Sequence, residues 1–171
     1  MITSKEIKNY LKGNGIDTKK VSVKELSGGY SQAFQITIKS SDIDIEEVEN
    51  LSQHFKNYET DERTGEILQG GNTFVFVEYD YNTIKEVNQK YNDVIIDKIK
   101  EKLKQHCQDD IDAWNKGDGA VKISKNIMIY KHNGCYEIRN LEDYKTLMSG
   151  KTYFAETLLK LGKLNEVLYE K

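Results

Sequence analysis

The chain has 171 residues, of which 37% are hydrophobic and 31% are charged, so it can bury a core in one domain or in two small ones. Its net charge of −3 is too small to indicate a dedicated nucleic-acid binder or a strongly acidic mimic. It has no long apolar run, and its two cysteines form no disulfide pattern, so we expect a soluble cytoplasmic protein with no membrane partner.

The N-terminal elements begin with a capped helix. Thr3 and Glu6 fit a capping box, and the glycines at positions 13 and 15 end the predicted helix. In residues 21–39, hydrophobic and polar residues then alternate on either side of a Ser-Gly-Gly sequence, which is typical of a half-buried β-hairpin.

A second helix is predicted over residues 45–56, with Asp44 and Glu47 as its capping box. A polar loop, residues 57–71, separates this helix from the strand-like residues 73–79. The order α-β-β-α-β therefore predicts a small three-stranded antiparallel sheet backed by two helices in a module of residues 1–81.

In residues 82–171, apolar residues at helical spacing predict one long helix from Asn82 to Lys116, with Cys107 buried on its apolar stripe. The sequence His132-Asn133-Gly134 predicts the turn of a β-hairpin. A short helix is expected at 141–148, and further helices follow residue 152. The predicted fold class is α+β, with two modules, 1–81 and 82–171, that can also pack as one domain.

No catalytic residue, metal ligand or cofactor site is predicted. Residues 149–152, Ser-Gly-Lys-Thr, resemble the end of a phosphate-binding loop, but the glycine that the full motif needs five residues before Gly150 is absent. Zinc would need two closely spaced ligand pairs, whereas the chain offers only residues 106–107 and the pair His132 and Cys135. Cys135 with His132 as a nucleophile and base is weaker still, because both lie at the predicted turn.

The acidic clusters at residues 42–44 and 109–112 could suggest a magnesium-dependent nuclease, but acids near helix ends usually act as caps or as solvated surface. The lysines at positions 98, 100, 102 and 104 are spaced so that they spread around a helix, which favours a solvated face.

The charge distribution suggests a protein-binding surface. Residues 1–81 hold 9 Lys and Arg against 14 Asp and Glu, whereas residues 82–171 hold 16 against 14. Nine carboxylates fall within residues 42–66, and tyrosine, which anchors many interfaces, occurs 11 times in the chain. Scattered surface tyrosine is the alternative interpretation. The candidate partner-binding residues are Glu59, Asp61, Glu62 and Glu66.

Short sequence signatures occur at residues 3–7, 21–23, 27–31, 36–38, 47–49 and 70–77. Through these segments, residues 1–81 resemble the large polyvalent protein-associated domains of phage and mobile-element proteins. The signature turns of this resemblance are Ser27, Gly28, Gly29, Tyr30, Gly70, Gly71 and Asn72. Residues 41–44 depart from the family pattern because they contain no proline.

The whole chain also resembles the small type II anti-CRISPR proteins of staphylococcal mobile elements. This resemblance implies a non-enzymatic protein that binds and inhibits the RNA-guided nuclease of its bacterial host. The alternatives are a nucleic-acid-binding accessory protein of a mobile element, which would use the lysine-rich C-terminal half, and an enzyme with a metal site. An exposed edge on the predicted sheet also leaves a homodimer open.

Overall fold

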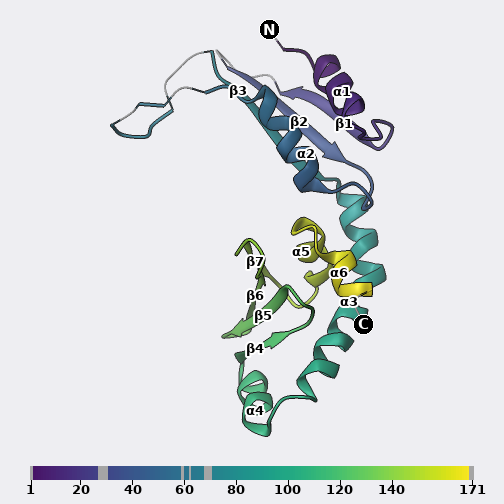
Figure 1. The fold of residues 1–171 in the computed structure, drawn as a ribbon, viewed down its shortest axis with the longest axis vertical. Coiled ribbons are helices and arrows are strands. Elements are labelled where there is room, and N and C mark those ends of the chain that lie inside the picture. Colours follow the sequence, from purple (N-terminus) through teal and green to yellow (C-terminus); the bar gives the residue numbers. More distant parts are fainter. Residues whose placement is uncertain (1, 27–30, 59, 62, 68–70, 170–171) are drawn as a thin grey trace. The chain divides into compact units, whose positions relative to one another are not determined.

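The computed structural model describes residues 2–26, 31–58, 60–61, 63–67 and 71–169. Its contacts divide the chain into an N-terminal unit, Met1–Thr83, and a C-terminal unit, Ile84–Lys171. Each unit combines helices with one sheet (Figure 1), and the predicted α+β class is confirmed. No helix of the described residues is long and apolar enough to cross a membrane.

The two α-helices of the N-terminal unit are capped at their N-termini by residues that directly precede them. Thr3 and Glu6 form the predicted capping box, and Asp44 accepts a hydrogen bond from the Glu46 N–H. Both caps satisfy N–H groups that have no partner within their helix. The elements are α1 (Ser4–Gly13), β1 (Val21–Leu26), β2 (Gln32–Ile38), α2 (Ile45–Ser52), the 3-10 helix η1 (Gln53–Phe55) and β3 (Thr73–Tyr79).

The sheet of the N-terminal unit is mixed, with strand order β1-β2-β3. β1 and β2 form the predicted antiparallel hairpin, but β3 runs parallel to β2, from Gln32 beside Thr73 to Ile38 beside Tyr79. The prediction of a wholly antiparallel sheet is therefore wrong. The physical reason is that α2 lies between the two strands and carries the chain back to the end where β2 began, as in a βαβ unit.

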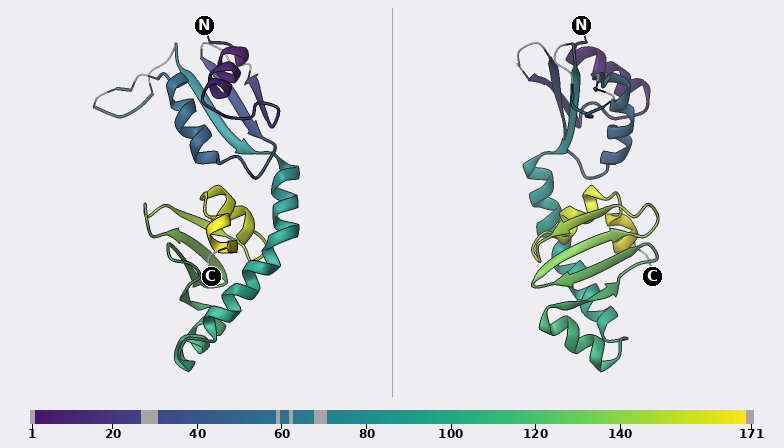
Figure 2. Two further views of the ribbon diagram at one scale, coloured as in Figure 1. Left: turned by 45° about the vertical axis from the view of Figure 1, so that its right-hand side comes forward. Right: turned by 90° about the vertical axis from the view of Figure 1, so that its left-hand side faces the viewer.

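The core of this unit lies on one face of the sheet. Phe34, Ile36 and Ile38 of β2 are fully buried, as are Ile7 and Leu11 of α1. Figure 2 shows α1 and α2 on the same side of the sheet, which leaves its other face uncovered by either helix. This arrangement explains why alternate residues of the strands are buried.

The buried Tyr79 ties β3 to the start of α2. Its hydroxyl donates to the Ile43 carbonyl at 2.8 Å and accepts from the Ile45 N–H at 3.2 Å. Burial raises the pKa of Tyr79 far above its ordinary value, so the phenol remains neutral and can donate.

The C-terminal unit contains an antiparallel sheet of four strands in the order β4-β5-β6-β7, with helices on one face. The predicted hairpin turn is confirmed, because β5 and β6 pair antiparallel and the turn residues Asn133 and Gly134 have φ of 49° and 81°. The elements are α3 (Tyr81–Leu103), α4 (Gln108–Lys116), β4 (Asp118–Lys122), β5 (Ile127–His132), β6 (Cys135–Asn140), β7 (Thr146–Ser149), α5 (Phe154–Lys160) and α6 (Leu164–Tyr169).

The long helix predicted from residue 82 to residue 116 is broken after Leu103, and α4 is separate. Cys107, predicted to be a buried packing thiol, is instead exposed at the N-cap of α4. A straight helix would carry Trp114 about 16 Å beyond Leu103. The break instead places Trp114 against Tyr136 of β6, with ring centroids 6.0 Å apart, so tertiary packing outweighs the helical spacing.

The short helix predicted at residues 141–148 is also wrong, because β7 occupies Thr146–Ser149. Leu147 pairs with Ile138, and Tyr144 takes the positive φ of 60° before the strand. The backbone N–H and C=O groups along β6 need partners on this side, and a strand supplies them where a helix would not.

The helix α5 is capped from α3. The buried Asn92 accepts hydrogen bonds from the N–H groups of Phe154 and Ala155, at 2.9 and 3.4 Å, and donates to the Lys151 carbonyl at 3.0 Å. One turn earlier, Asn88 accepts from the Glu156 N–H at 3.0 Å. The N-cap residue of α5, Tyr153, makes no side-chain hydrogen bond to the helix. The two asparagines of α3 accept from the first N–H groups of α5 in its place.

Candidate functional site

An arm, residues 57–67, extends from the sheet of the N-terminal unit beside the start of β3 (Figure 1). At its base, Asn57 and Thr73 exchange two backbone hydrogen bonds of 2.6 and 3.1 Å. Further out, Thr60 and Ile67 form an antiparallel bridge. The polar loop predicted from the sequence is therefore held as a narrow antiparallel pair at these two points.

The tip of the arm is a turn organised by Asp61. Its carboxylate accepts from the N–H groups of Arg63 and Thr64, at 2.9 and 2.8 Å. These backbone donors, with Thr64 first, hold the pKa of Asp61 below its ordinary value. The backbone closes the turn through bonds of 2.8 Å from Asp61 N–H to the Glu66 carbonyl and from Gly65 N–H to the Asp61 carbonyl. Asp61 is thus a turn-forming residue as well as a surface charge.

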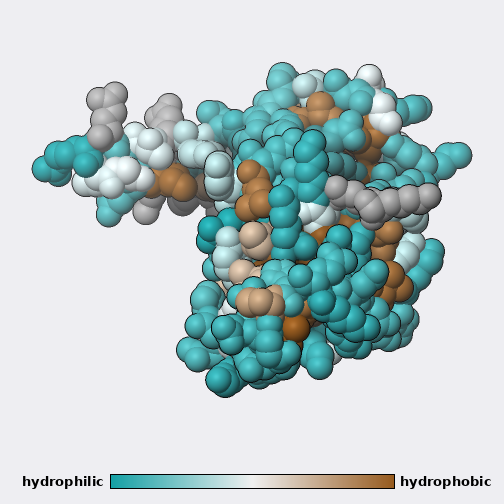
Figure 3. Space-filling model, turned by 60° about the horizontal axis from the view of Figure 1, so that its bottom comes forward, coloured by the Kyte–Doolittle hydropathy of each residue, from teal (hydrophilic) through white to brown (hydrophobic). Residues whose placement is uncertain are grey.

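Hydrophobic side chains accompany the carboxylates of the arm. Tyr58 is half exposed and stacks parallel to Phe74 of β3, with ring centroids 6.2 Å apart. Ile67 on the arm and Phe76 on β3 are also exposed, by 50% and 55%. Figure 3 shows hydrophobic surface on the arm between hydrophilic side chains. Such a mixture of apolar contact area and charge is suited to binding another protein.

Of the predicted partner-binding residues, Asp61 and Glu66 lie on opposite sides of the turn at the tip of the arm. Glu66 is exposed and Asp61 is partly exposed, whereas Glu59 and Glu62 lie outside the described residues. The acidic segment as a whole is not one surface. Asp42 pairs with Lys20 at 2.6 Å, which lowers the pKa of Asp42, and Asp44 caps α2.

The signature turns of the family resemblance are only partly described. Gly71 adopts a φ of +70°, as expected for a glycine in a turn. The next residue, Asn72, is buried, and its carbonyl accepts from the Gln32 N–H at 2.8 Å. Outside the described residues lie Ser27, Gly28, Gly29, Tyr30 and Gly70.

A second candidate site, the lysine pocket, lies wholly within the C-terminal unit. It has a volume of about 290 Å³ and is formed where the C-terminal part of α3 faces the end of β4 and the turn that follows. Four of its side chains are lysines. The other four are a glutamine, a histidine, an isoleucine and a serine, so no carboxylate lines the pocket. The lining residues are Lys98, Lys102, Gln105, His106, Lys122, Ile123, Ser124 and Lys125.

Helical spacing and strand geometry bring the four lysines together. Lys98 and Lys102 are one turn apart on α3 and lie on the same face of that helix. Lys122 and Lys125 flank Ile123, which is fully buried and anchors this end of β4 in the core. The Lys98 amino group donates to the Val167 carbonyl, which restrains that side chain. The sequence interpretation of Lys98 and Lys102 as part of a solvated face missed this convergence, because Lys122 and Lys125 come from a distant segment.

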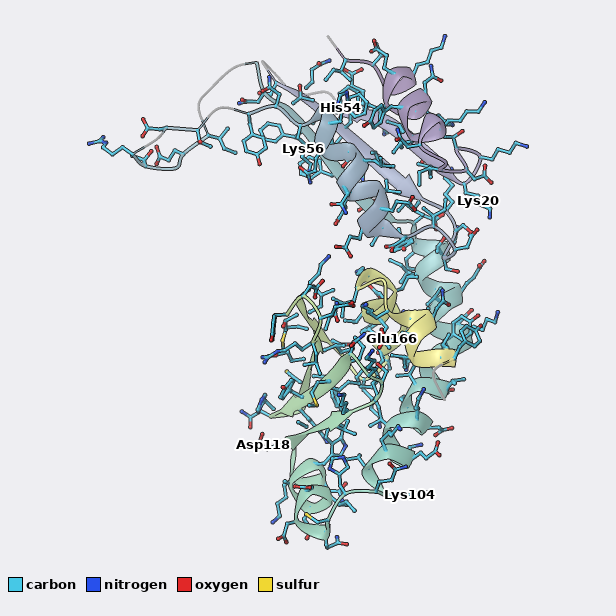
Figure 4. The ribbon with its side chains drawn as sticks, viewed as in Figure 1. Lys20, His54, Lys56, Lys104, Asp118 and Glu166 are labelled. Atoms are coloured by element: carbon cyan, nitrogen blue, oxygen red, sulfur yellow. The ribbon has the colours of Figure 1, made fainter. Side chains whose placement is uncertain are left out.

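The turn that carries Lys125 is fixed by Glu166 of α6, which is labelled in Figure 4. The Ser124 hydroxyl donates to one Glu166 oxygen at 2.7 Å, and the Asn126 N–H donates to the same oxygen at 3.1 Å. Burial acts to raise the pKa of Glu166, but these hydrogen bonds outweigh it and lower that pKa below its ordinary value. Lys163, at 3.6 Å, contributes to the lowering.

Strand pairing places the catalytic candidates His132 and Cys135 opposite each other at the β5–β6 turn, with Asp118 opposite His132 on β4. His132 pairs with Asp118 across the sheet at 2.8 Å, and both side chains are mostly exposed. Cys135 is an exposed free thiol at the other side of the hairpin turn. The Ser-Gly-Lys-Thr segment begins at the last residue of β7 and leads into α5, and its Lys151 carbonyl accepts a hydrogen bond from the Asn92 amide. Among the described residues, no group of three or more His, Cys, Asp or Glu is placed to hold a metal ion.

A larger pocket, of about 480 Å³, lies between β7 and α5 in the same unit. Its walls include the exposed apolar residues Met148 and Tyr153, and the ion pair of Glu156 with Lys160, at 2.6 Å, lies at its edge. Its charges are therefore balanced, in contrast to those of the lysine pocket.

No family model, no curated protein and no solved structure matches this chain. The candidate sites are therefore interpreted from their own chemistry. The arm presents carboxylates beside apolar side chains, and the lysine pocket presents converging amino groups.

Proposed function

We propose that this protein is a non-enzymatic inhibitor, encoded by a phage or another mobile element, that acts in the cytoplasm of a bacterial host. Its target is a host defence protein, the RNA-guided nuclease of a type II CRISPR system in complex with its guide RNA. The target class comes from the resemblance of the chain to anti-CRISPR proteins, and the mode of action is stoichiometric binding.

The observation that carries this proposal is the arm. Its base is tied to Thr73 by two backbone hydrogen bonds and its tip is closed by the Asp61 turn, so these two parts of the arm are ordered before a partner binds. Its exposed Glu66 and Ile67 combine a charge with an apolar anchor.

Charge complementarity supports the choice of a nucleic-acid-handling partner. A nuclease that binds DNA and RNA presents basic grooves, and an acidic protrusion competes with the phosphate backbone for them. The strand β1 lies at one edge of the three-stranded sheet. The proposal therefore includes a homodimer in which β1 pairs with a strand of a second copy.

The test is a DNA-cleavage assay with a purified type II effector and its guide RNA, titrated with this protein. We expect cleavage to stop near a one-to-one ratio, and a complex to form in size-exclusion chromatography. Full cleavage at excess protein together with no complex would overturn the proposal.

Two variants test whether inhibition depends on the arm or on other surfaces of the N-terminal unit. Replacement of residues 60–67 by Gly-Gly should abolish inhibition, because it removes the tip but keeps the Asn57–Thr73 base. Glu66→Lys should slow association, most strongly at low salt. The matched control is Glu25→Lys, an equal charge reversal at an exposed position on β1, at the other edge of the sheet. Equal inhibition by wild type and by the shortened variant would exclude the arm as the binding element.

A second candidate function, nucleic-acid binding by an accessory protein of a mobile element, is favoured by a separate observation, the lysine pocket. Its test is direct binding to DNA at about 50 mM salt, where phosphate contacts are strong. A flat titration would exclude it without bearing on the arm.

A further inference from the structure

We infer that the lysine pocket binds phosphate groups of a nucleic-acid backbone. This inference rests on the second candidate function and deepens it, because it names the site and the group that is recognised. It goes beyond the inhibitor proposal, which depends on the arm in the other unit.

The first argument is the kind of side chain that lines the pocket. Four lysines supply amino groups, and Gln105 and Ser124 add polar atoms, but none of the eight lining residues is a carboxylate. Lysine binds phosphate as a point charge and needs no fixed fork geometry, so a cluster of lysines suits a backbone whose phosphates carry no sequence information.

The second argument is that part of the site is already ordered. Lys98 donates a hydrogen bond to the Val167 carbonyl. The turn that carries Lys125 is fixed by the hydrogen bonds of Ser124 and Asn126 to Glu166. A restrained cation loses less side-chain entropy when it meets an anion than a freely rotating surface lysine does.

Two carboxylates, Asp110 and Glu166, contact side chains that line the pocket, and an unpaired acid there would oppose an anion. Asp110 faces His106 at 3.4 Å. Glu166 faces Ser124, Asn126 and Lys163 and is committed to them. Both of these acids therefore have partners of their own.

The experiment measures the anisotropy of a short fluorescein-labelled DNA duplex with the full-length protein at several salt concentrations. The variant Lys102→Gln/Lys122→Gln removes both charges but keeps polar side chains, and it avoids Lys98, which has a structural contact. We expect it to bind about tenfold more weakly at about 50 mM salt, with a salt slope reduced by about 2, because two phosphate contacts are lost.

The matched control is Lys8→Gln/Lys12→Gln, which removes the same charge from exposed positions one turn apart on α1. It should bind as the wild type does. Circular dichroism melts of both variants show whether a loss of binding reflects unfolding, and a second variant, Lys125→Gln, repeats the test from the turn.

The outcomes distinguish the failures. No binding by the wild type overturns both the second candidate function and this inference. Binding that the Lys102/Lys122 change leaves intact overturns the pocket as the site but keeps the function. Equal competition by inorganic phosphate and by duplex DNA, at equal phosphate concentration, would mean that the pocket takes free phosphate and would overturn the assignment to a nucleic-acid backbone.

Discussion

In the N-terminal unit the helices are capped by residues next to them in sequence, Thr3 for α1 and Asp44 for α2. In the C-terminal unit α5 is capped by Asn92, which precedes it by 62 residues, and α6 is tied to the β4–β5 turn by Glu166. Long-range polar bonds to buried groups are costly to leave unmade. Both units have an apolar core, and in the first unit the buried Tyr79 also makes long-range polar bonds. The units differ in how their helix N-termini are satisfied, by neighbouring residues for α1 and α2 and by a distant residue for α5.

The largest expected effect comes from the core of the N-terminal unit. Phe34→Ala removes a fully buried ring from β2 and should lower the free energy of unfolding by about 3–5 kcal/mol. Urea unfolding followed by far-UV circular dichroism measures this loss. The fluorescence of Trp114, the single tryptophan, reports on the C-terminal unit, where its ring neighbours Tyr136. We expect the urea midpoint followed by Trp114 fluorescence to stay unchanged. If it shifts as much as the midpoint followed by circular dichroism, the two units unfold together.

The next effect tests the polar ties of the C-terminal unit. Asn92→Ala should cost about 2–3 kcal/mol, because it leaves the N–H groups of Phe154 and Ala155 buried without their acceptor. For this variant, the urea midpoint followed by Trp114 fluorescence should fall. Asn92→Asp, which keeps an acceptor, should recover part of the loss, and the half-buried Asn88→Ala should cost only about 0.5–1 kcal/mol. Equal losses for Asn88→Ala and Asn92→Ala would contradict the role of burial.

A smaller and pH-dependent effect is expected at Glu166. Because the folded-state pKa lies below the ordinary value of 4.5, the carboxylate stabilises the fold fully above that value, and its contribution is lost as the pH falls through the lowered pKa. Glu166→Gln should therefore cost about 1–2 kcal/mol near pH 7. Thermal melts across the pH range should show the gap between wild type and variant narrowing below 4.5. A gap that is constant or widens on acidification would contradict the assignment.

The smallest effect on stability is expected at the arm. Asp61→Ala should leave the unfolding midpoint unchanged, because the side chain is partly exposed and the bonds that it accepts come from the turn itself. The amide hydrogens of Arg63 and Thr64 should exchange faster, since both lose their acceptor. Hydrogen exchange followed by NMR measures this, and Glu66→Ala is the control that should leave both rates unchanged.

Local sequence signals were sufficient for several elements. The Thr3–Glu6 box, the alternation of Phe34, Ile36 and Ile38, and the Asn133–Gly134 turn each act over a few residues, and each was confirmed. The parallel pairing of β2 with β3 is not specified by local patterns, because strand direction depends on the crossover through α2.

The candidate sites show the same limit. Asp61 and Glu66 could be selected from charge alone, since they are close in sequence and lie on one turn. The lysine pocket could not, because Lys98 and Lys102 meet Lys122 and Lys125 only after α3 breaks and the chain returns along β4.

Local patterns in the sequence were enough to predict the α+β class, the N-caps Thr3 and Asp44, and the Asn133–Gly134 turn, because these depend on backbone preferences and on side chains a few residues apart. Tertiary structure alone decided where α3 ends, that residues 146–149 form a strand, and that α5 takes its cap from Asn92. In each of these cases a buried side chain or an unpaired backbone group is satisfied by a distant segment, and that free energy exceeds the small local preference for a longer or shorter helix.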